Sequence, residues 1–444
     1  MKIFIVLLAL PVIQAQSTGF RVFLAGDSIL NRRLSVYKDP AYQALFDNIR
    51  HADAAFTNLE TLIHGIDLPG ASVSGGAYMN SPPWIVDEIK WAGFNLLGVA
   101  NNHAFDYGVE GMRSTLRALD AAGLAHAGTG ENLALARAPV YLDTADGRVA
   151  LVACASTFTP GSNAGEQRPD LPGRPGLSPL RFSTTYTVDS TTLEGLRRLQ
   201  LLNAPNSGQR NGPVRIGGTT FHGGGAPAIH TAPLKEDLEG IVASVREARR
   251  QADWVIASIH AHEGMPGNRE APAEFLVTFA HAVIDAGADV LVAHGPHVLR
   301  AIEIYKGRPI FYSVANFAFE NETMQFQPAE SYQELGLPSS ANAADFYDLR
   351  SKNDTRGFPV DRPVWESVVA EVAFQPDRRP KQILLHPISL GFGEPRPRRG
   401  RPRPATPELS QEIINNLAKL SAPFGTKIDF ANGIGVVDLT HVVP

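Results

Sequence analysis

Short apolar runs that end in polar side chains recur along the chain and indicate how it is organised. The clearest run covers 93–99 and is followed by Asn101, Asn102 and His103, and then by a helical pattern over 109–122. A continuous apolar run of this length is typical of a strand buried on both faces. Further runs of the same character are 20–25, 53–61, 253–260, 288–297 and 309–317.

Helical periodicity fills most of the intervals between these runs. Apolar residues recur at helical spacing in 42–50, 82–90, 109–122, 234–252, 274–286 and 407–420. Shorter runs predict two β-hairpins and a last strand, at 138–142 with 148–153, at 368–374 with 382–387, and at 435–439. Strands that alternate with helices in this way predict an α/β fold.

Two long segments show neither the helical spacing of apolar residues nor the apolar runs of buried strands. Segment 158–233 is rich in Pro, Gly, Ser and Asn, with one helical piece at 193–202. Because compact domains seldom carry so long a loop without a function, three interpretations are open: a lid over a site, a substrate-binding insertion, or a partly disordered segment. A second irregular segment covers 325–363, and 395–404 is an extended run of Arg and Pro.

The N-terminus has the pattern of a secretory signal peptide over 1–15. Lys2 is followed by an apolar run over 3–13 and by the small residue Ala15. The run is too short to span a bilayer comfortably, and a first core strand is the alternative interpretation. Behind it we expect one main domain over 20–325, which carries the insertion at 158–233, and a region 326–444 that completes the fold.

Composition excludes some classes of protein. Hydrophobic residues make up 44% and charged residues 19% of the chain, which is typical of a globular protein. The net charge of -5 gives no reason to expect a nucleic-acid partner. Cys154 is the single cysteine, so an intramolecular disulfide is excluded, and its apolar surroundings indicate a buried thiol.

Side chains able to bind a metal stand at the ends of the predicted strands. They are Asp27, Glu60, Asn102, His103, His260, His262, His294 and His297. Each alone also fits a cap, a turn or a surface position, but the carboxyl ends of strands are where α/β proteins gather their sites. Carboxylate, amide oxygen and imidazole suit Mn, Zn or Fe, and one or two such ions are expected.

Two ions would need a bridging carboxylate, and Glu60 is the candidate for that position. His103 is expected to face the substrate, as a general acid or as a group that stabilises an anion. No Gly-x-Ser-x-Gly elbow, Walker loop or complete dinucleotide-binding motif offers a competing site.

Several of these segments resemble the capsule-synthesis CapA family. They are 24–27, 57–60, 100–108, 258–263, 294–300 and 310–317. Proteins of this family are similar to calcineurin-like metallophosphoesterases and include accessory proteins of bacterial poly-γ-glutamate synthesis. The resemblance covers roughly 20–319 and is weaker over 158–233. It implies a four-layer αββα sandwich with long loop insertions.

The resemblance also implies roles for individual residues. The positions that match metal ligands are Asp27, Glu60, Asn102, His260, His294 and His297. His103 matches the histidine near the scissile group, and we place His262 on the substrate side as well. Two features depart from the metallophosphoesterase pattern: Ile29 replaces a usual histidine ligand, and the usual Gly-His-x-His pair is spaced His-Gly-Pro-His. A site with one metal, or with a weakly occupied second position, is therefore an alternative.

Together these features predict an exported, metal-dependent hydrolase acting on a phosphoester or on a γ-linked glutamyl polymer. One alternative is a non-catalytic accessory protein of the cell envelope that binds an anionic polymer during capsule or poly-γ-glutamate synthesis. Another is a purely structural exported protein. The expected location is secreted, periplasmic or in the cell envelope, and the expected partners are the substrate and the envelope synthesis machinery. The oligomeric state is not predicted.

Overall fold

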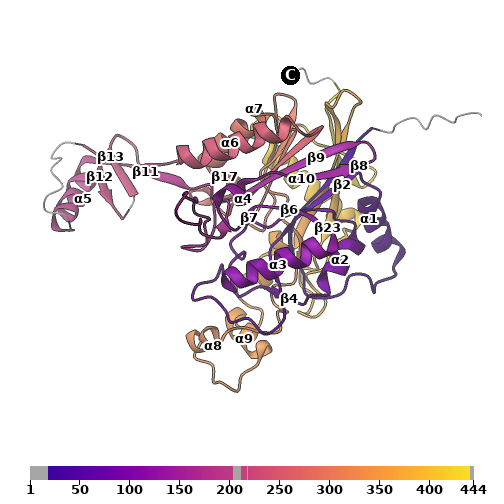
Figure 1. Ribbon diagram of the computed structural model, residues 1–444, viewed down its shortest axis with the longest axis horizontal. Helices are drawn as coiled ribbons and strands as arrows, with labels where there is room; N and C mark the ends of the chain where they lie inside the picture. Colours follow the sequence, from indigo (N-terminus) through magenta and orange to yellow (C-terminus); the bar gives the residue numbers. More distant parts are fainter. Residues whose placement is uncertain (1–18, 204–211, 218, 441–444) are drawn as a thin grey trace, which may run out of the picture.

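The structure is a computed structural model that describes residues 19–203, 212–217 and 219–440. The signal peptide expected over 1–15 lies outside these residues. Among the described helices, none combines the length and apolar character needed to cross a bilayer. Figure 1 shows the strands gathered at the centre, helices along their flanks, and one long extension away from the body.

The larger of the two main sheets has ten strands, in the order β25-β26-β23-β22-β1-β2-β5-β6, with β21 paired to β1 and β24 to β23. Its strands are β1 (Arg21–Ile29), β2 (Ala54–Leu59), β5 (Leu96–Gly98), β6 (Ala125–Ala127), β21 (Asn316–Phe319), β22 (Glu366–Phe374), β23 (Pro380–Ser389), β24 (Arg403–Pro404), β25 (Asp429–Ala431) and β26 (Ile434–Asp438). Strands β1, β2, β5 and β6 are parallel, and β22, β23 and β26 continue the sheet in antiparallel pairs.

The smaller main sheet has six strands, in the order β19-β20-β18-β15-β9-β8. Its strands are β8 (Val140–Thr144), β9 (Gly147–Ala155), β15 (Trp254–His260), β18 (Val290–His294), β19 (Ile302–Tyr305) and β20 (Arg308–Phe311). The four central strands are parallel, and β8 and β19 close the two edges as antiparallel hairpin partners.

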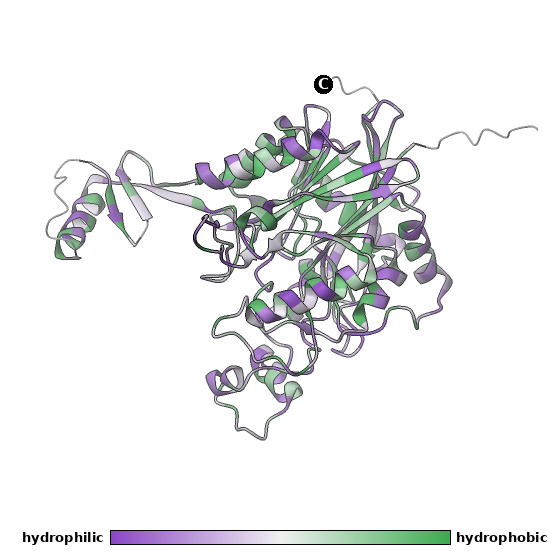
Figure 2. Ribbon diagram, in the orientation of Figure 1, coloured by the Kyte–Doolittle hydropathy of each residue, from purple (hydrophilic) through white to green (hydrophobic). Residues whose placement is uncertain are grey.

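The two sheets pack face to face and helices cover both outer faces. On β1, Val22 and Leu24 belong to the core between the sheets, whereas Phe23 and Ala25 belong to the core beneath the helices. Because both faces of such a strand are buried, its sequence is a continuous apolar run. Figure 2 shows the hydrophobic colour concentrated in these strands. The expected four-layer αββα sandwich is confirmed.

Each helical layer packs through a few large side chains. The helices α1, α2 and α3 bury Phe46, Ile89 and Leu119, respectively, against the larger sheet. On the smaller sheet, α6 contributes Val245 and α7 contributes Phe279. The helices are α1 (Pro40–Arg50), α2 (Ile85–Ala92), α3 (Gly108–Ala122), α6 (Lys235–Arg249), α7 (Glu274–Asp285) and α10 (Pro407–Ser421). Helix α10 packs against the open end of the core between the sheets.

Segment 158–233 is more ordered than its composition indicates. Its first part packs on the body through backbone hydrogen bonds of Gly165 and Ser178: the carbonyl of Gly165 accepts from the N–H of Leu133, and the N–H of Ser178 donates to the carbonyl of Gly128. The rest, 182–233, forms a four-stranded sheet with one helix, which we call the projecting subdomain. Its elements are β11 (Phe182–Val188), α5 (Ser190–Asn203), β12 (Val214–Ile216), β13 (Thr219–Gly223) and β14 (Ala228–Pro233). The interpretation as an irregular loop was wrong, because these strands are half exposed on both faces and show no alternation.

The second segment expected to be irregular, 325–363, also contains helices. These are α8 (Ala329–Glu334), α9 (Ala343–Ser351), η1 (Phe358–Val360) and η2 (Arg362–Trp365). A capping box between Asn342 and Asp345 begins α9, and this signal was overlooked in the sequence. The remaining short elements are β3 (Leu62–Ile63), β4 (Asn80–Ser81), β7 (Thr129–Gly130), α4 (Leu133–Arg137), β10 (Gly176–Leu177), β16 (Gly264–Met265), β17 (Asn268–Pro272) and η3 (Ala422–Phe424).

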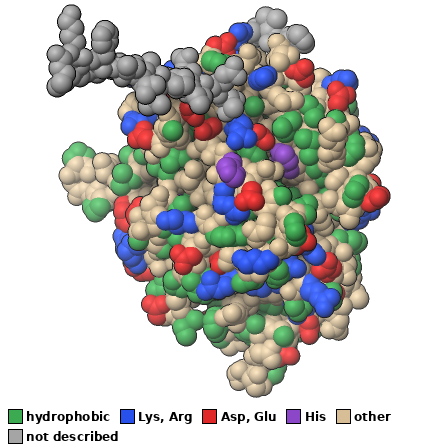
Figure 3. Space-filling view, turned by 90° about the vertical axis from the view of Figure 1, so that its right-hand side faces the viewer, with side chains coloured by type: hydrophobic (Ala, Val, Ile, Leu, Met, Phe, Trp, Pro, Cys, Tyr) green, Lys and Arg blue, Asp and Glu red, His purple; other side chains and the backbone are tan. Residues whose placement is uncertain are grey.

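On the face shown in Figure 3, charged side chains do not separate into acidic and basic areas. Acidic and basic groups are interspersed with apolar ones on the face in Figure 3. This distribution agrees with the small net charge of -5, and it gives no support to a nucleic-acid partner on that face.

Candidate metal centre

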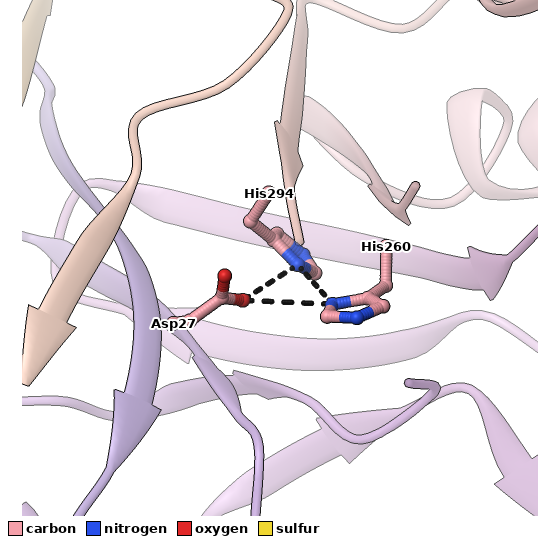
Figure 4. A group of neighbouring side chains, drawn as sticks. All are labelled: Asp27, His260 and His294. Carbon is pink, nitrogen blue, oxygen red and sulfur yellow. Dashed lines mark hydrogen bonds and ion pairs between the residues drawn. The ribbon is translucent and has the colours of Figure 1, made fainter. Parts of the chain in front are cut away.

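Parallel strands of both sheets end side by side, and their last residues form a cluster of carboxylates and imidazoles. In the larger sheet, Asp27 of β1 pairs in register with Asn58 of β2. In the smaller sheet, His260 ends β15 and pairs in register with His294 at the end of β18. Figure 4 shows Asp27 directed at His260 and His294 across the interface between the sheets. All of these side chains are buried.

Asp27, His260 and His294 form the first group with the geometry of metal ligands. Asp27 Oδ1 lies 3.1 Å from His294 Nδ1 and 3.5 Å from His260 Nδ1. The two Nδ1 atoms are 3.1 Å apart. A metal with bonds of about 2.1 Å holds neighbouring ligand atoms roughly 3.0–3.4 Å apart. The three atoms therefore have the spacing of ligands that share one ion.

Glu60, which follows β2, is at the centre of the remaining candidate ligands. Its Oε1 lies 3.7 Å from His260 Nε2, 3.9 Å from His297 Nε2 and 4.0 Å from His103 Nε2. The side chain is fully buried, and neither carboxylate oxygen has a hydrogen-bond partner among the described residues. A buried carboxylate without a partner is costly unless a cation accompanies it. The donor set around Glu60 therefore fits a divalent metal.

His262 lies with the candidate ligands as well. Its Nε2 is 2.9 Å from Nε2 of His260. Together with Glu60, these two histidines form a second group with the spacing of metal ligands. A third such group consists of Asp27, Glu60 and His297. The structure thus places His262 beside the carboxylate rather than apart from it, and its role on the substrate side stays a prediction.

Burial and mutual charge set the protonation of the cluster. Burial raises the pKa of Glu60 well above its usual value, and the charges of Asp27 and Asp106 raise it further. Burial also opposes ionisation of Asp27, but hydrogen bonds from His260 and His294 hold the pKa of this carboxyl well below its usual range.

Burial lowers the pKa of His260 to about 4 and the pKa of His262 well below the usual value. The pKa of His297 is also lowered, first by burial. Imidazoles that stay neutral at pH 7 are in the form that binds metals. The electrostatics therefore favour a cation at this position.

His103 is oriented by a carboxylate that the sequence interpretation missed. Nδ1 of His103 lies 2.6 Å from Oδ2 of Asp106. The same carboxylate accepts two backbone hydrogen bonds, from Gly75 N–H at Oδ1 and from Met79 N–H at Oδ2. This arrangement turns Nε2 of His103 towards Glu60. The Asn-x₄-Asp spacing after β5 contained this residue, but nothing in the local pattern distinguished it from a helix-start carboxylate.

Asn102 lies at the rim of the cluster. Its Nδ2 donates to the carbonyl of Gly75 at 3.1 Å, whereas its Oδ1 is buried without a partner. The free oxygen fits the expected role as an amide ligand.

Other polar residues hold the ligands in place, and the sequence interpretation missed them too. Asn58 Nδ2 donates to Asp27 Oδ1 at 2.8 Å, Asn316 Oδ1 lies 2.8 Å from His297 Nδ1, and Ser258 Oγ lies 3.0 Å from His294 Nε2. Such partners orient metal ligands and fix the tautomer of each imidazole. Ile29, by contrast, packs in the apolar core, so no ligand replaces the missing histidine there.

Backbone constraints bring these side chains together. A Cβ on Gly26 would lie 1.8 Å from the carbonyl oxygen of Ala315, so only glycine permits this approach beside Asp27. His297 and Ala315 both have positive φ, at 58° and 57°. Non-glycine residues in this region are strained and occur often at functional sites.

The fold and the cluster define a class: an α/β protein of two stacked sheets with a candidate divalent-metal centre where the strands end. The chain belongs to the bacterial capsule synthesis protein PGA_cap family, whose model matches residues 21–321.

The chain is also similar to individual proteins. The uncharacterized protein y4sH of Sinorhizobium fredii is 39% identical over an alignment of 448 positions, which covers 95% of this chain and 93% of that protein. The capsule biosynthesis protein CapA of Bacillus anthracis is 28% identical over 53% of this chain and 42% of its own length. A novel phosphatase of Mycoplasma pneumoniae, known from a crystal structure, has a TM-score of 0.38 and 11% identity over 90% of this chain and 99% of that chain.

Proposed function

We propose that this protein is an exported, metal-dependent hydrolase that acts on a phosphoester or on a γ-linked glutamyl polymer. Glu60 is the single observation that carries the proposal: a fully buried carboxylate without partners, surrounded by imidazoles from the opposite sheet. A purely structural protein has no reason to retain so unfavourable a group. The relatives' names place capsule or polyglutamine synthesis in their function, and this supports an anionic substrate.

The chain's own residues account for the remaining requirements of hydrolysis. Asp27, Glu60, His260, His262, His294 and His297 would hold one or two ions, with Asn102 as a further ligand. A Mn, Zn or Fe ion in this position supplies Lewis acidity towards water and towards a substrate oxygen. His103, held through Nδ1 by Asp106, keeps Nε2 free to donate a proton to a leaving group or to stabilise an anion.

The test combines elemental analysis with an activity screen. The purified protein is expected to hold Mn, Zn or Fe and to hydrolyse p-nitrophenyl phosphate, bis-p-nitrophenyl phosphate or poly-γ-glutamate in the presence of Mn. Glu60→Gln and His297→Ala should lower the metal content and abolish the activity. Glu408→Gln and His222→Ala serve as matched controls, because both residues are exposed and distant from the cluster in sequence.

The outcomes separate the alternatives. Metal content that depends on Glu60 without any hydrolysis would favour the non-catalytic accessory that binds an anionic polymer and cooperates with the envelope synthesis machinery. Equal metal content in wild type and in both cluster variants would contradict the metal site itself. Export is tested separately: mass spectrometry should find an N-terminus near Gln16 in the mature protein.

A further inference from the structure

A cavity of about 690 Å³ is lined mainly by residues of α9, of the loop after it and of η1. Asn321, Tyr347, Arg350, Lys352, Arg356 and Phe358 are among its lining residues. Except for Asn321, the lining residues follow the region that matches the family model, which ends at residue 321. We call this space the basic cavity.

Phe358 joins the basic cavity to the metal cluster. Its ring lies edge-on to the ring of His297 with centroids 5.7 Å apart, and it packs on Phe319 at 5.0 Å. One aromatic ring therefore lies between the cavity and a candidate ligand. A substrate held at the metal can extend into this space if it is a chain.

Three cations of the cavity have no partner in the described protein. Arg350, Lys352 and Arg356 are exposed, and none of their side chains forms an ion pair or hydrogen bond with another described residue. Elsewhere on the surface many arginines are paired, as Arg269 is with Asp361. Of the acidic lining residues, Glu322 and Asp361 are paired to Arg399 and Arg269, which leaves Glu334 as the unpaired one. The excess charge that faces the cavity is therefore positive.

A buried amide adds an unsatisfied polar group to the same wall. Asn321 is 3% exposed, and its Oδ1 has no hydrogen-bond partner among the residues that the structure describes. The amide can present either its oxygen or its NH₂ group to a ligand. Peptide-like linkages offer both a hydrogen-bond donor and a hydrogen-bond acceptor. A buried amide next to cations therefore suits a ligand chain that combines such linkages with anionic groups.

Hydrogen bonds of Arg399 connect two segments of the cavity wall. Arg399 bonds Glu322 and Asp354, and so joins the strand-end segment to the loop after α9. In that loop, Lys352, Asn353 and Asp354 all have positive φ, at 48°, 55° and 63°. Three consecutive non-glycine residues in this region persist only where the surroundings hold them. The backbone that carries Lys352 is thus held by its surroundings.

We propose that the basic cavity binds the chain of a polyanionic substrate next to the bond held at the metal centre. The inference rests on the proposed function and makes it more specific: the substrate carries several carboxylates or phosphates along an extended chain, and a single phosphoester is a poor substitute. Arg350, Lys352 and Arg356 determine this specificity by pairing with anionic groups away from the scissile bond.

Equilibrium binding tests the proposal without requiring activity. Fluorescence anisotropy is measured with a labelled chain of γ-linked glutamates and with labelled polyphosphate, on wild type and on the variant Arg350→Gln/Lys352→Gln/Arg356→Gln. The matched control is Arg117→Gln/Arg246→Gln/Lys419→Gln, which removes the same charges from exposed, unpaired positions on α3, α6 and α10. Melting temperature and metal content confirm that both variants fold.

Loss of roughly tenfold in affinity is expected for the cavity variant, because three exposed ion pairs together contribute about that much. The control should bind as wild type does, and added salt should weaken wild-type binding. Binding of either polyanion supports the proposal, and the tighter one identifies whether carboxylates or phosphates are recognised. Equal losses in both variants, no loss in either, or no binding of both polyanions by wild type would overturn it.

A kinetic comparison then separates this inference from the proposed function. If the protein is a hydrolase, the cavity variant should raise KM for the chain substrate and leave turnover of p-nitrophenyl phosphate unchanged. If hydrolysis is absent while the binding difference remains, the proposed enzyme activity fails and the basic cavity stands as a polyanion-binding site.

Discussion

Glu60 is the residue on which the stability of the cluster depends most directly. Burial, and then the charges of Asp27 and Asp106, raises the pKa of Glu60 well above 4.5. A group with a raised pKa in the folded state stabilises the protein at low pH and loses this contribution as pH rises. A bound cation removes the penalty, because it pairs with the ionised form.

The first prediction follows from this direction of the pH dependence of stability. In chelator, Glu60→Gln should melt at the same temperature as wild type near pH 4.5 and several degrees higher at pH 8, because the amide never has to ionise. With excess Mn the order should reverse, since the variant lacks a ligand. Thermal melts across pH, with Glu408→Gln as control, provide the measurement. A constant difference at every pH would contradict the raised pKa, because it would show that Glu60 has the same pKa in the folded and unfolded states.

His103 and Asp106 give the second prediction. Asp106→Asn replaces the carboxylate that orients the imidazole at 2.6 Å, but Asp106 belongs to none of the candidate ligand groups. Turnover should fall roughly 10- to 100-fold with metal content and KM nearly unchanged, as is usual for a residue that orients another. Steady-state kinetics and elemental analysis on one preparation check it. Loss of metal in this variant would instead make Asp106 part of the metal site.

Among the elements, the projecting subdomain behaves as a separate unit. Figure 1 shows its sheet and α5 extending from the body, and its base packs on α7 through β14. Phe182 stacks on Phe275 at this base, with ring centroids 4.2 Å apart. The subdomain therefore extends away from the body, and the interpretation of the insertion as a lid over the site stays a prediction.

Deletion of the subdomain is the third prediction. Ser183 and Ala232 are paired in register on β11 and β14, so a short glycine linker can join them. The shortened protein should keep its metal content, and its melting temperature should change by no more than a few degrees, because no core cluster depends on the removed residues apart from the base. Circular dichroism and elemental analysis measure both. Removal of 159–180, which hydrogen-bonds to β7 and β9, should by contrast unfold the protein.

For the whole molecule, the metal centre joins the two sheets. Asp27 and Glu60 come from the larger sheet, and His260 and His294 come from the smaller one. An ion bound by both sets of ligands stabilises the packed sandwich and not the unfolded chain.

Metal removal is the fourth prediction. Chelation should lower the melting temperature, and Mn, Zn or Fe at about 100 times its Kd should restore about 2.7 kcal/mol of stability. Differential scanning calorimetry with and without added metal measures the shift, and addition of Ca²⁺, which prefers oxygen ligands, is the control. An unchanged melting temperature on chelation would contradict a metal that bridges the sheets.

The sequence alone determined the strands that carry the site and the residues at their ends. Strands buried on both faces have continuous apolar sequences, so 20–25, 93–99, 253–260 and 288–297 could be recognised from local pattern. The carboxyl ends of parallel strands meet at one edge, which made a cluster of Asp27, Glu60 and the histidines a reasonable expectation. Periodicity predicted the individual strands and helices. Their arrangement in two stacked sheets with a helical layer on each side came from the sequence resemblance.

Only the tertiary structure decided how these residues face one another. Asn58, Asp106 and Asn316 contact the cluster through packing between segments far apart in the chain, so no local pattern identified them. His262 sits beside Glu60 because the turn after β15 folds back towards β18. The same reason applies to the basic cavity. Arg350 lies in the last turn of α9 and the other two cations follow this helix, and only the packing of Phe358 on His297 brings the cavity near the metal centre.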